Sequence, residues 1–361
     1  MKEYTQEQLC RMWLIGLDGV GPVTYAQWMA DCGCAEAIYQ GRGELEAMVG
    51  KLNPKQRQSV ANARTVESAA QRLYDSGARV VFAEDAEYPR YLDVLSNPPP
   101  LLYVMGQADC LNRGPTVSMV GARSGTRYGR EIAGILAQET VRHGAVVVSG
   151  GARGVDAAAH MGALAAGGVT IAVLGTGVDI AYPAENARLF AQICERGALI
   201  SEYAPGVSAM AEHFPQRNRM VSALADVVLL VEAEMKSGAM ITAKLAREQG
   251  KPLAAVPGQI NNAFAQGPHW HLRNGAAPIY SAKDLLEELG LAQDFSNPQQ
   301  MRLRPLSADE QRIVDILRTE DSSHEQLAQQ SGIAAHTLNS LLTILSLDGI
   351  IKQLPGNQYG I

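Results

Sequence analysis

The sequence has no long apolar run. None of its 361 residues belong to an uninterrupted apolar stretch of about 18 residues, which a membrane-spanning helix requires. It begins Met-Lys-Glu-Tyr-Thr-Gln, which lacks the basic and then apolar pattern of a secretory signal. The apolar share of 47% is still enough to fill a sizeable core. We therefore expect a globular cytoplasmic protein with no membrane insertion.

Cysteine is scarce and unpatterned. The five cysteines, at positions 10, 32, 34, 110 and 194, fit neither a paired disulfide framework nor the four-ligand spacing of a zinc site. Cys32 and Cys34, two positions apart, are by themselves a weak signal. We expect five reduced thiols and no metal site.

Positive charge is also in short supply, because the net charge is −6. Affinity for phosphates comes from Lys and Arg side chains that release counterions, so the overall charge counts against a nucleic-acid partner. The arginines are nevertheless clustered. Arg123, Arg127 and Arg130 share one short segment, and Arg217 and Arg219 share another. Local basic patches are therefore compatible with the composition.

The length and the pattern predict several domains. Residues 1–75 have apolar residues at helical spacing between Gly-rich turns, which predicts a small helical domain. Residues 76–292 alternate strand-like and helical stretches and form the expected main domain. The segment 293–305 has no periodicity and predicts a linker to a last domain, 306–361.

The main domain is predicted to be an α/β fold with a doubly wound, parallel, Rossmann-like sheet. The run from Asp226 to Val231 is apolar without alternation, as expected for a strand covered by helices on both faces. A first strand, Arg79–Phe82, precedes a proline-rich connector. The strands predicted after it are Thr116–Val120, Ala145–Ser149, Val169–Leu174, Ala198–Ser201, Val227–Val231 and Leu253–Val256.

The N-terminal domain contains one phosphate-binding candidate. The segment 15–22 reads Ile-Gly-Leu-Asp-Gly-Val-Gly-Pro and is similar to the turn of a helix-hairpin-helix or SAM-like domain, in which backbone amides often contact phosphates. A plain helical turn explains the same residues equally well.

The C-terminal segment is predicted to be a winged-helix domain. Ser307 with Glu310, and Ser323 with Gln326, form capping boxes that begin two helices, and a third helix follows Gly332. The turn 355–357 then separates two short strands. The expected recognition helix, 335–347, contains neither Lys nor Arg, which favours a protein-contact role over base reading.

Glycine-rich loops follow the first two strands after residue 115. They read Gly-Ala-Arg-Ser-Gly-Thr-Arg-Tyr-Gly after Val120 and Ser-Gly-Gly-Ala-Arg-Gly-Val-Asp at 149–156. Because carboxyl ends of parallel strands meet at one sheet edge, and glycine lets backbone N–H groups approach an anion, we expect a phosphate groove there. The candidate residues are Gly121, Arg123, Ser124, Arg127, Ser149, Gly150, Gly151 and Arg153. The alternative is that these glycines only permit tight turns.

Later loops extend this edge. The stretch 213–219, His-Phe-Pro-Gln-Arg-Asn-Arg, combines backbone-binding charge with an aromatic ring, as single-stranded nucleic acid requires. After the strand 227–231, a hydroxyl-bearing helix start predicts another anion site. The candidates from these two loops are Phe214, Arg217, Asn218, Arg219, Ser237, Gly238 and Thr242. A surface helix with incidental arginines is the alternative for 213–219.

Signatures of cofactors and catalysis are missing. The first loop does not have the Gly-x-Gly-x-x-Gly spacing, and the second strand ends in Ser149-Gly150-Gly151 without an acid for a ribose diol. A Ser/His/Asp order, HExxH and a P-loop are likewise absent. Asp156 is equally well explained as a first-turn acid that matches the helix dipole, and His160 as a packed residue. We therefore assign no catalytic residue and no cofactor.

Taken together, the motifs resemble the DNA-processing protein A (DprA/Smf) family. The resemblance covers about residues 80–290, and both flanking domains agree with longer members. The matching motifs lie at 88–92, 102–103, 120–129, 149–156, 174–177, 201–206, 214–219 and 256–258. It implies a homodimeric recombination mediator of natural transformation rather than an enzyme. Such a protein binds incoming single-stranded DNA, protects it from nucleases, and loads RecA on strands coated by single-strand-binding protein.

The resemblance also assigns residues. It implies that Arg123 holds DNA phosphates and that Phe214, Arg217, Asn218 and Arg219 lie in a second DNA-contacting motif. Gln216 stands where many members carry a basic residue, and 266–272 departs from the usual Gly-x-Asn-x-Leu-Ile pattern.

Two other functions stay open on the sequence. One is a nucleoside-monophosphate glycosidase of the lysine-decarboxylase-like family, although that family's Pro-Gly-Gly-x-Gly-Thr-x-x-Glu motif is absent. The other is a regulator that binds DNA through the winged helix, which the uncharged recognition helix disfavours.

Overall fold

The computed structural model describes residues 4–63, 65–291, 306–347, 350–354 and 358–360. The chain separates into two compact units, Met1–Gln293 and Asp294–Ile361. The N-terminal helices and the sheet belong to the same unit, so a domain boundary at residue 75 stays a prediction. The predicted linker 293–305 lies outside the described residues. Within them, none of the helices has the length and apolarity to cross a membrane.

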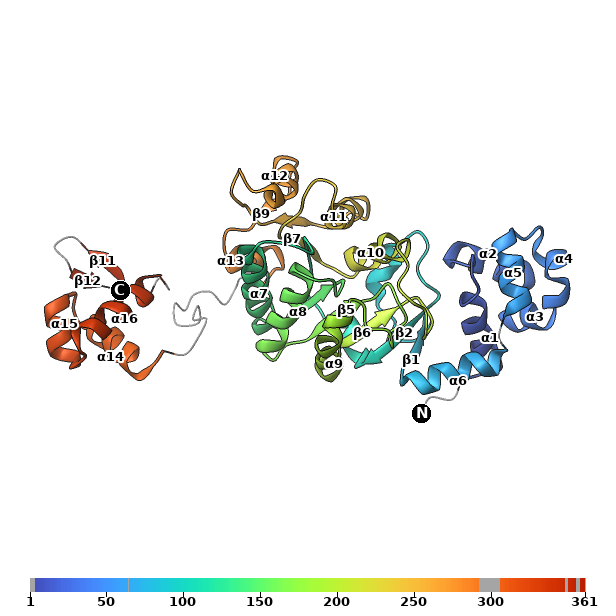
Figure 1. The fold of residues 1–361 in the computed structure, drawn as a ribbon, viewed down its shortest axis with the longest axis horizontal. Coiled ribbons are helices and arrows are strands. Elements are labelled where there is room, and N and C mark those ends of the chain that lie inside the picture. Colours follow the sequence, from blue (N-terminus) through green and yellow to red (C-terminus); the bar gives the residue numbers. More distant parts are fainter. Residues whose placement is uncertain (1–3, 64, 292–305, 348–349, 355–357, 361) are drawn as a thin grey trace. The chain divides into compact units, whose positions relative to one another are not determined.

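The first unit begins with short helices, as predicted (Figure 1). Thr5 and Asn53 begin α1 and α5 with capping boxes, and glycines end several of the others. Their buried faces share one apolar cluster that includes Trp13, Trp28 and Ile38. The helices are α1 (Gln6–Ile15), α2 (Pro22–Cys32), α3 (Ala35–Gln40), α4 (Leu45–Val49), α5 (Pro54–Asn62) and α6 (Val66–Ser76), with a 3₁₀ turn at Arg42–Glu44.

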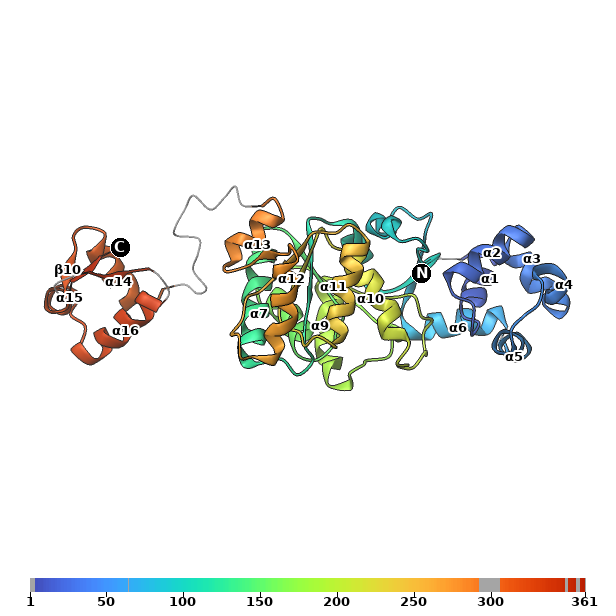
Figure 2. The ribbon, with the colours of Figure 1, turned by 90° about the horizontal axis from the view of Figure 1, so that it is seen from above.

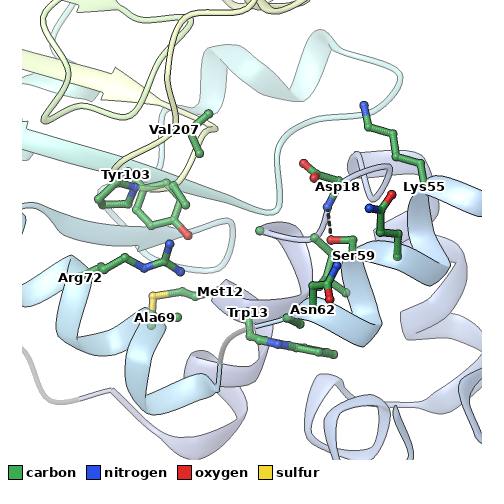
Figure 3. A pocket seen from close by; sticks show the side chains of 16 residues that line it. Met12, Trp13, Asp18, Lys55, Ser59, Asn62, Ala69, Arg72, Tyr103 and Val207 are labelled. Atoms are coloured by element: carbon green, nitrogen blue, oxygen red, sulfur yellow. Dashed lines mark hydrogen bonds between the residues drawn. The ribbon is translucent and has the colours of Figure 1, made fainter. Parts of the chain in front are cut away.

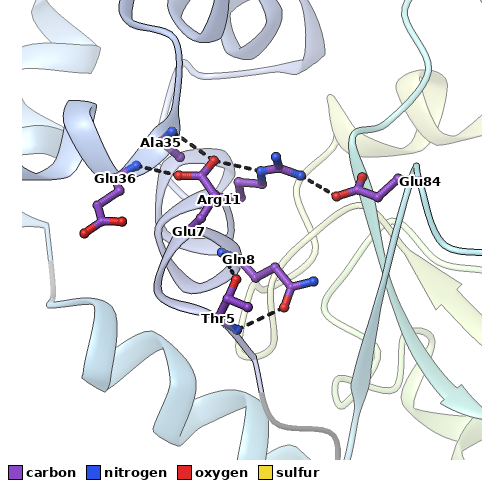
Figure 4. Close-up of polar contacts among 7 residues, drawn as sticks. All are labelled: Thr5, Glu7, Gln8, Arg11, Ala35, Glu36 and Glu84. Carbon is purple, nitrogen blue, oxygen red and sulfur yellow. Dashed lines mark hydrogen bonds and ion pairs between the residues drawn. The ribbon is translucent and has the colours of Figure 1, made fainter.

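Polar contacts attach α1 to the sheet. The Val80 backbone N–H, in the first strand, donates to the Tyr4 hydroxyl at 2.9 Å. Arg11 pairs with Glu7 on its own helix and reaches Glu84, with Nη1 2.5 Å from Oε1 (Figure 4). Glu7 also accepts the backbone N–H groups of Ala35 and Glu36 at the start of α3. The Glu7 carboxylate thus links the start of α3 to Arg11, which in turn contacts the segment after β1.

The described part of this unit contains a mostly parallel sheet in the order β1-β2-β6-β5-β4-β3-β7-β8-β9 (Figures 1 and 2). The strands are β1 (Arg79–Phe82), β2 (Leu101–Gly106), β3 (Thr116–Val120), β4 (Val146–Ser149), β5 (Thr170–Val173), β6 (Ala198–Ser201), β7 (Val227–Leu230), β8 (Leu253–Ala255) and β9 (Ala277–Pro278). The predicted parallel, Rossmann-like sheet is confirmed, with strand ends within about a residue of those expected. The sequence reading missed β2, which pairs antiparallel with both β1 and β6, and the short β9.

Helices cover both faces of the sheet. Alternate residues of each strand point to opposite sides, so Val117 and Met119 pack with α7, α8 and α13, whereas Val120 packs with α10 and α11. α9 covers the β2 side together with part of α1 and α6, and Leu272 of α12 packs against the same cluster as α10 and α11. These helices are α7 (Arg127–Arg142), α8 (Val155–Ala165), α9 (Ala187–Arg196), α10 (His213–Ala223), α11 (Gly238–Glu248), α12 (Gln266–Arg273) and α13 (Ala282–Glu288), with 3₁₀ turns at Arg90–Val94, Ala108–Asn112, Ala184–Asn186 and Ala263–Ala265.

The second unit has the predicted winged-helix pattern. Ser307 and Ser323 begin their helices with capping boxes, and Gly332 ends the second helix in the left-handed conformation. The elements are α14 (Ala308–Leu317), β10 (Ser322–Ser323), α15 (His324–Ser331), α16 (Ala335–Leu347), β11 (Lys352–Leu354) and β12 (Gln358–Gly360), the strands pairing as β10-β12-β11. The predicted turn at 355–357 lies outside the described residues.

His160 of α8 is a core residue, fully buried beneath the sheet. The Thr170 hydroxyl donates to the carbonyl of Val147, so His160 Nδ1, 2.7 Å from that hydroxyl oxygen, must be the donor to it. Burial, with Arg217 adding to it, lowers the pKa of His160 to about 3. The neutral imidazole belongs to the packing between α8 and β5.

This burial predicts a pH-dependent loss of stability. Below pH about 6.5, the unfolded chain binds a proton at His160 that the folded chain does not accept, so the free energy of unfolding falls as pH drops toward about 3. Urea unfolding at pH 7 and pH 5 should show that His160→Leu reduces the stability difference between these pH values by about 2 kcal/mol. An unchanged difference would mean that folded His160 is protonated.

Candidate functional site

The carboxyl ends of β3, β4 and β7 border one groove of about 620 Å³. We call it the strand-end groove. Its wall includes these residues predicted from the sequence: Gly121, Arg123, Ser124, Gly150, Phe214, Arg217, Asn218, Ser237, Gly238 and Thr242. Arg153 lines a small adjoining pocket and pairs with Glu185, its Nη2 lying 2.9 Å from Oε2. Segments far apart in the sequence are thus brought together as the parallel sheet requires.

Besides Arg153, four predicted residues are not part of this wall. Arg127, the first residue of α7, is exposed outside the groove. Ser149 is buried and donates to the Met119 carbonyl at 2.6 Å. Gly151 lies against the Phe190 ring in a positive-φ conformation. Arg219 forms an ion pair with the largely buried Glu202, and its Nη1 donates to the Asn97 carbonyl at 2.9 Å.

The amino end of α7 is occupied by a carboxylate of the chain itself. Glu232, which follows β7 and is 3% exposed, accepts the Thr126 backbone N–H at 2.8 Å and the Thr126 hydroxyl at 2.6 Å. A side chain at Gly129 would collide with Glu232, so this glycine makes room for the carboxylate. The first glycine loop therefore receives an internal anion where an external phosphate was expected.

The second glycine loop is closed in the same way. Asp156, at the start of α8, is 6% exposed and accepts the Ala152 backbone N–H at 3.3 Å. Burial raises the pKa of Asp156, while the Arg217 guanidinium and backbone hydrogen bonds oppose the rise. Asp156 is thus a structural acid of the loop, consistent with its interpretation as a first-turn acid.

Arg217 is a buried residue of the groove wall. Its side chain is 4% exposed, and its Nη1 donates to the carbonyls of Gly150 and Val173, at the ends of β4 and β5. Burial lowers its pKa to about 10, although nearby Asp156 acts in the opposite direction. A Cβ at Gly150 would come within 2.7 Å of the guanidinium, which explains why glycine stands there. Arg217 therefore holds two strand ends and α10 together as well as reaching the groove.

The exposed chemistry of the groove is a cation beside two rings. Arg123 Cζ lies 5.4 Å from the centroid of the Phe214 ring, within the range of a cation–π contact. The Tyr182 ring packs against the Phe214 ring, with the two centroids 5.3 Å apart and an interplanar angle of 34°. Tyr182 is 44% exposed. Tyr182 was not among the residues predicted to bind DNA, although it stands in the glycine-rich loop that follows β5.

Among the described residues, no side chain caps the amino end of α11 by a hydrogen bond, although Glu234 lines the same groove. Ser237 is the N-cap, but its hydroxyl makes no capping hydrogen bond and is buried without a partner in this part of the chain. Gly238 beside it carries no side chain, and the Thr242 hydroxyl lines the groove one turn later. Of the three helix starts expected to bind anions, α11 is the one left open toward the groove.

The role of Glu232 is testable by substitution. Glu232→Ala should lower the free energy of unfolding by about 2–4 kcal/mol, because the buried Thr126 N–H and hydroxyl lose their acceptor. Glu232→Gln, which keeps one carbonyl oxygen, should lose less. Urea unfolding checks the order, and hydrogen exchange at Thr126 and Gly129 should accelerate more in the alanine variant. Equal, small losses in both would rule out a loop-holding role.

Comparisons with known proteins agree with this architecture. The family model for DNA recombination-mediator protein A matches residues 79–290, and the DprA winged-helix model matches residues 297–357. The chain is 30% identical over 362 residues to Protein Smf of Escherichia coli, covering 98% of this chain and 94% of that one. It is 40% identical over 201 residues to DNA processing protein DprA of Streptococcus pneumoniae, covering 56% and 71%.

Two solved structures have the same fold. The X-ray structure of DNA processing protein A from Streptococcus pneumoniae has a TM-score of 0.64 at 30% identity, over 80% of this chain and 99% of that one. A structure of DNA processing protein A from Helicobacter pylori, described for its single-stranded DNA binding mode, has a TM-score of 0.54 at 34% identity, over 59% and 97%. By its sequence motifs, its sheet and its matches, the chain belongs to the DNA recombination-mediator protein A (DprA/Smf) family.

Proposed function

We propose that this protein binds single-stranded DNA in the strand-end groove. The observation that carries the proposal is the exposed Arg123 guanidinium beside the Phe214 and Tyr182 rings. A base stacked on such a ring contributes about 1–3 kcal/mol whatever its identity, and an adjacent cation contacts the backbone. The relative from Helicobacter pylori, described for its single-stranded DNA binding mode, supports the same ligand class.

The groove suits a chain of phosphates better than one small anion. Arg123, on the loop after β3, and the amino end of α11, after β7, come from different loops and offer two phosphate contacts in the same groove. Two other helix starts are closed by Glu232 and Asp156. A strand that bridges the two phosphate contacts explains why the stacking rings lie in the same groove.

We propose binding rather than catalysis. The groove wall contains two carboxylates in the described residues, Asp156 and Glu234. Asp156 is engaged with its own loop and with Arg217, and therefore lacks the freedom of a general acid or base. The nucleoside-monophosphate glycosidase is disfavoured because its Pro-Gly-Gly-x-Gly-Thr-x-x-Glu motif is missing.

In the cell, we propose, a homodimer of this protein receives incoming strands during natural transformation. It shields them from nucleases and loads RecA where single-strand-binding protein already covers the DNA. Membership of the recombination-mediator family supports this role. The sequence-independent chemistry of the groove supports it too, because transforming DNA has no fixed sequence.

The ligand class is tested by fluorescence anisotropy with labelled oligo-dT and a duplex of equal length. We expect much tighter binding of oligo-dT, because duplex bases are not free to stack on Phe214. The logarithm of the affinity should fall linearly with the logarithm of the salt concentration. Equal affinity for the duplex would overturn the proposal, whereas release of free base from nucleoside monophosphates would favour the glycosidase.

The Arg123→Ala variant tests whether binding depends on the groove itself or only on the overall positive charge of the protein. Loss of one phosphate contact should weaken oligo-dT binding about tenfold and reduce the salt slope by about 0.7. The matched control is Arg127→Ala, which removes an exposed arginine four residues away but outside the groove wall. Equal losses in the two variants would show that only overall charge matters. Arg217→Ala is a poorer probe, because Arg217 also holds the ends of β4 and β5.

The proposed loading of RecA is tested by following RecA-catalysed ATP hydrolysis on circular single-stranded DNA coated with single-strand-binding protein. We expect the wild-type protein to shorten the lag before hydrolysis and Arg123→Ala to leave the lag long. A wild-type protein that binds oligo-dT but leaves the lag unchanged would retain the binding proposal and contradict RecA loading.

A further inference from the structure

A second cavity, of about 430 Å³, lies between the N-terminal helices and the sheet (Figure 3). We call it the lateral cleft. The helices contribute Trp13, Lys55 and Arg72, and the sheet side contributes Tyr103 and Val207. The strand-end groove does not include these residues. The wall of the cleft also contains Gly16, Leu17 and Asp18, which belong to the segment 15–22 that the sequence offered as a phosphate-binding candidate.

One loop forms a wall of both cavities. In the segment between β6 and α10, Ala204 and Val207 line the lateral cleft, whereas Ala209 and Ala211 line the strand-end groove. At the end of this loop, Glu212 pairs with Lys55, with Nζ 3.7 Å from Oε1. Phe214, the stacking ring of the groove, follows two residues later. The lateral cleft therefore adjoins the groove at the start of α10.

The wall of the cleft combines cations with hydrogen-bonding groups. Lys55 is 58% exposed, so its pairing with the equally exposed Glu212 is weak and easily exchanged. Arg72 is exposed on α6, and Figure 3 shows its guanidinium directed toward the Tyr103 hydroxyl. The wall also contains one acidic residue, Asp18. The backbone N–H of Asp18 donates to the Ser59 hydroxyl at 2.8 Å.

Trp13 forms a buried, apolar part of the cleft wall. It is 4% exposed, and its ring packs in the apolar cluster of the N-terminal helices, against Tyr39. The polar chemistry of the cleft is therefore that of its exposed side chains, Lys55 and Arg72.

We infer that the lateral cleft takes a further stretch of the same DNA strand that the groove holds. The inference rests on the proposed function. The shared loop gives the strand a continuous path past Phe214, and the exposed Lys55 and Arg72 side chains supply contacts to the DNA backbone. The N-terminal helices are then part of the DNA-binding surface and lengthen the site beyond the sheet edge.

The test compares oligo-dT of about 20 nucleotides with oligo-dT of about 6, which is long enough to fill a groove but not both cavities. The variant carries Lys55→Gln and Arg72→Gln. We expect it to bind the long oligonucleotide about tenfold more weakly than wild type, with a salt slope reduced by about 1.4 for two lost phosphate contacts. Its affinity for the short oligonucleotide should equal that of wild type.

A matched control carries Lys283→Gln and Arg113→Gln. It removes the same charge from exposed residues that pair with Glu287 and Asp109, away from both cavities. If the control loses as much affinity, or if the cleft variant binds the long oligonucleotide as wild type does, the inference is wrong. Failure of the proposed function is distinct, because wild type would then not bind the short oligonucleotide and Arg123→Ala would have no effect.

Discussion

Glu232 and Asp156 each place a buried carboxylate over the backbone N–H groups of a glycine loop, and the binding edge depends on these contacts. The loops carry the groove-lining residues, and their glycines leave room for neighbouring side chains and backbone. A helix amino end attracts anions because its N–H groups are unpaired and its dipole is positive there. Here the chain supplies two of those anions itself, so the loops keep one conformation without a ligand.

Because Glu232 and Asp156 occupy two of the glycine loops, fewer positive groups of the groove are available to a ligand. Arg217 and Arg219 are engaged by carbonyls and Glu202, whereas Arg123 stays exposed beside two rings. A protein with net charge −6 thus presents a local cationic site in a groove. At such a site, the position of the cation and the stacking rings contribute more to binding than the overall charge of the protein does.

The loop between β6 and α10 connects the two cavities physically. It forms a wall of each, and it ends at Glu212, which Lys55 contacts from the N-terminal helices. Arg11 fixes the same helices to the segment after β1 through Glu84. The N-terminal helices therefore contact the rest of the unit at more than one point beside the edge where DNA is proposed to bind.

The sequence by itself determined β1 and the strands from β3 to β8, the capped helices, and the convergence of glycine loops at one edge, because these follow from local periodicity and from the geometry of parallel strands. Only the tertiary structure decided what each arginine does and which acids close the loops. Thr126 and Glu232 are 106 positions apart, and Arg217 reaches Gly150 across 67 positions. No local pattern records such pairings. Tyr182 became a candidate binding residue only once the structure placed its ring beside that of Phe214. The spacing of residues in the sequence does not encode such contacts between distant segments.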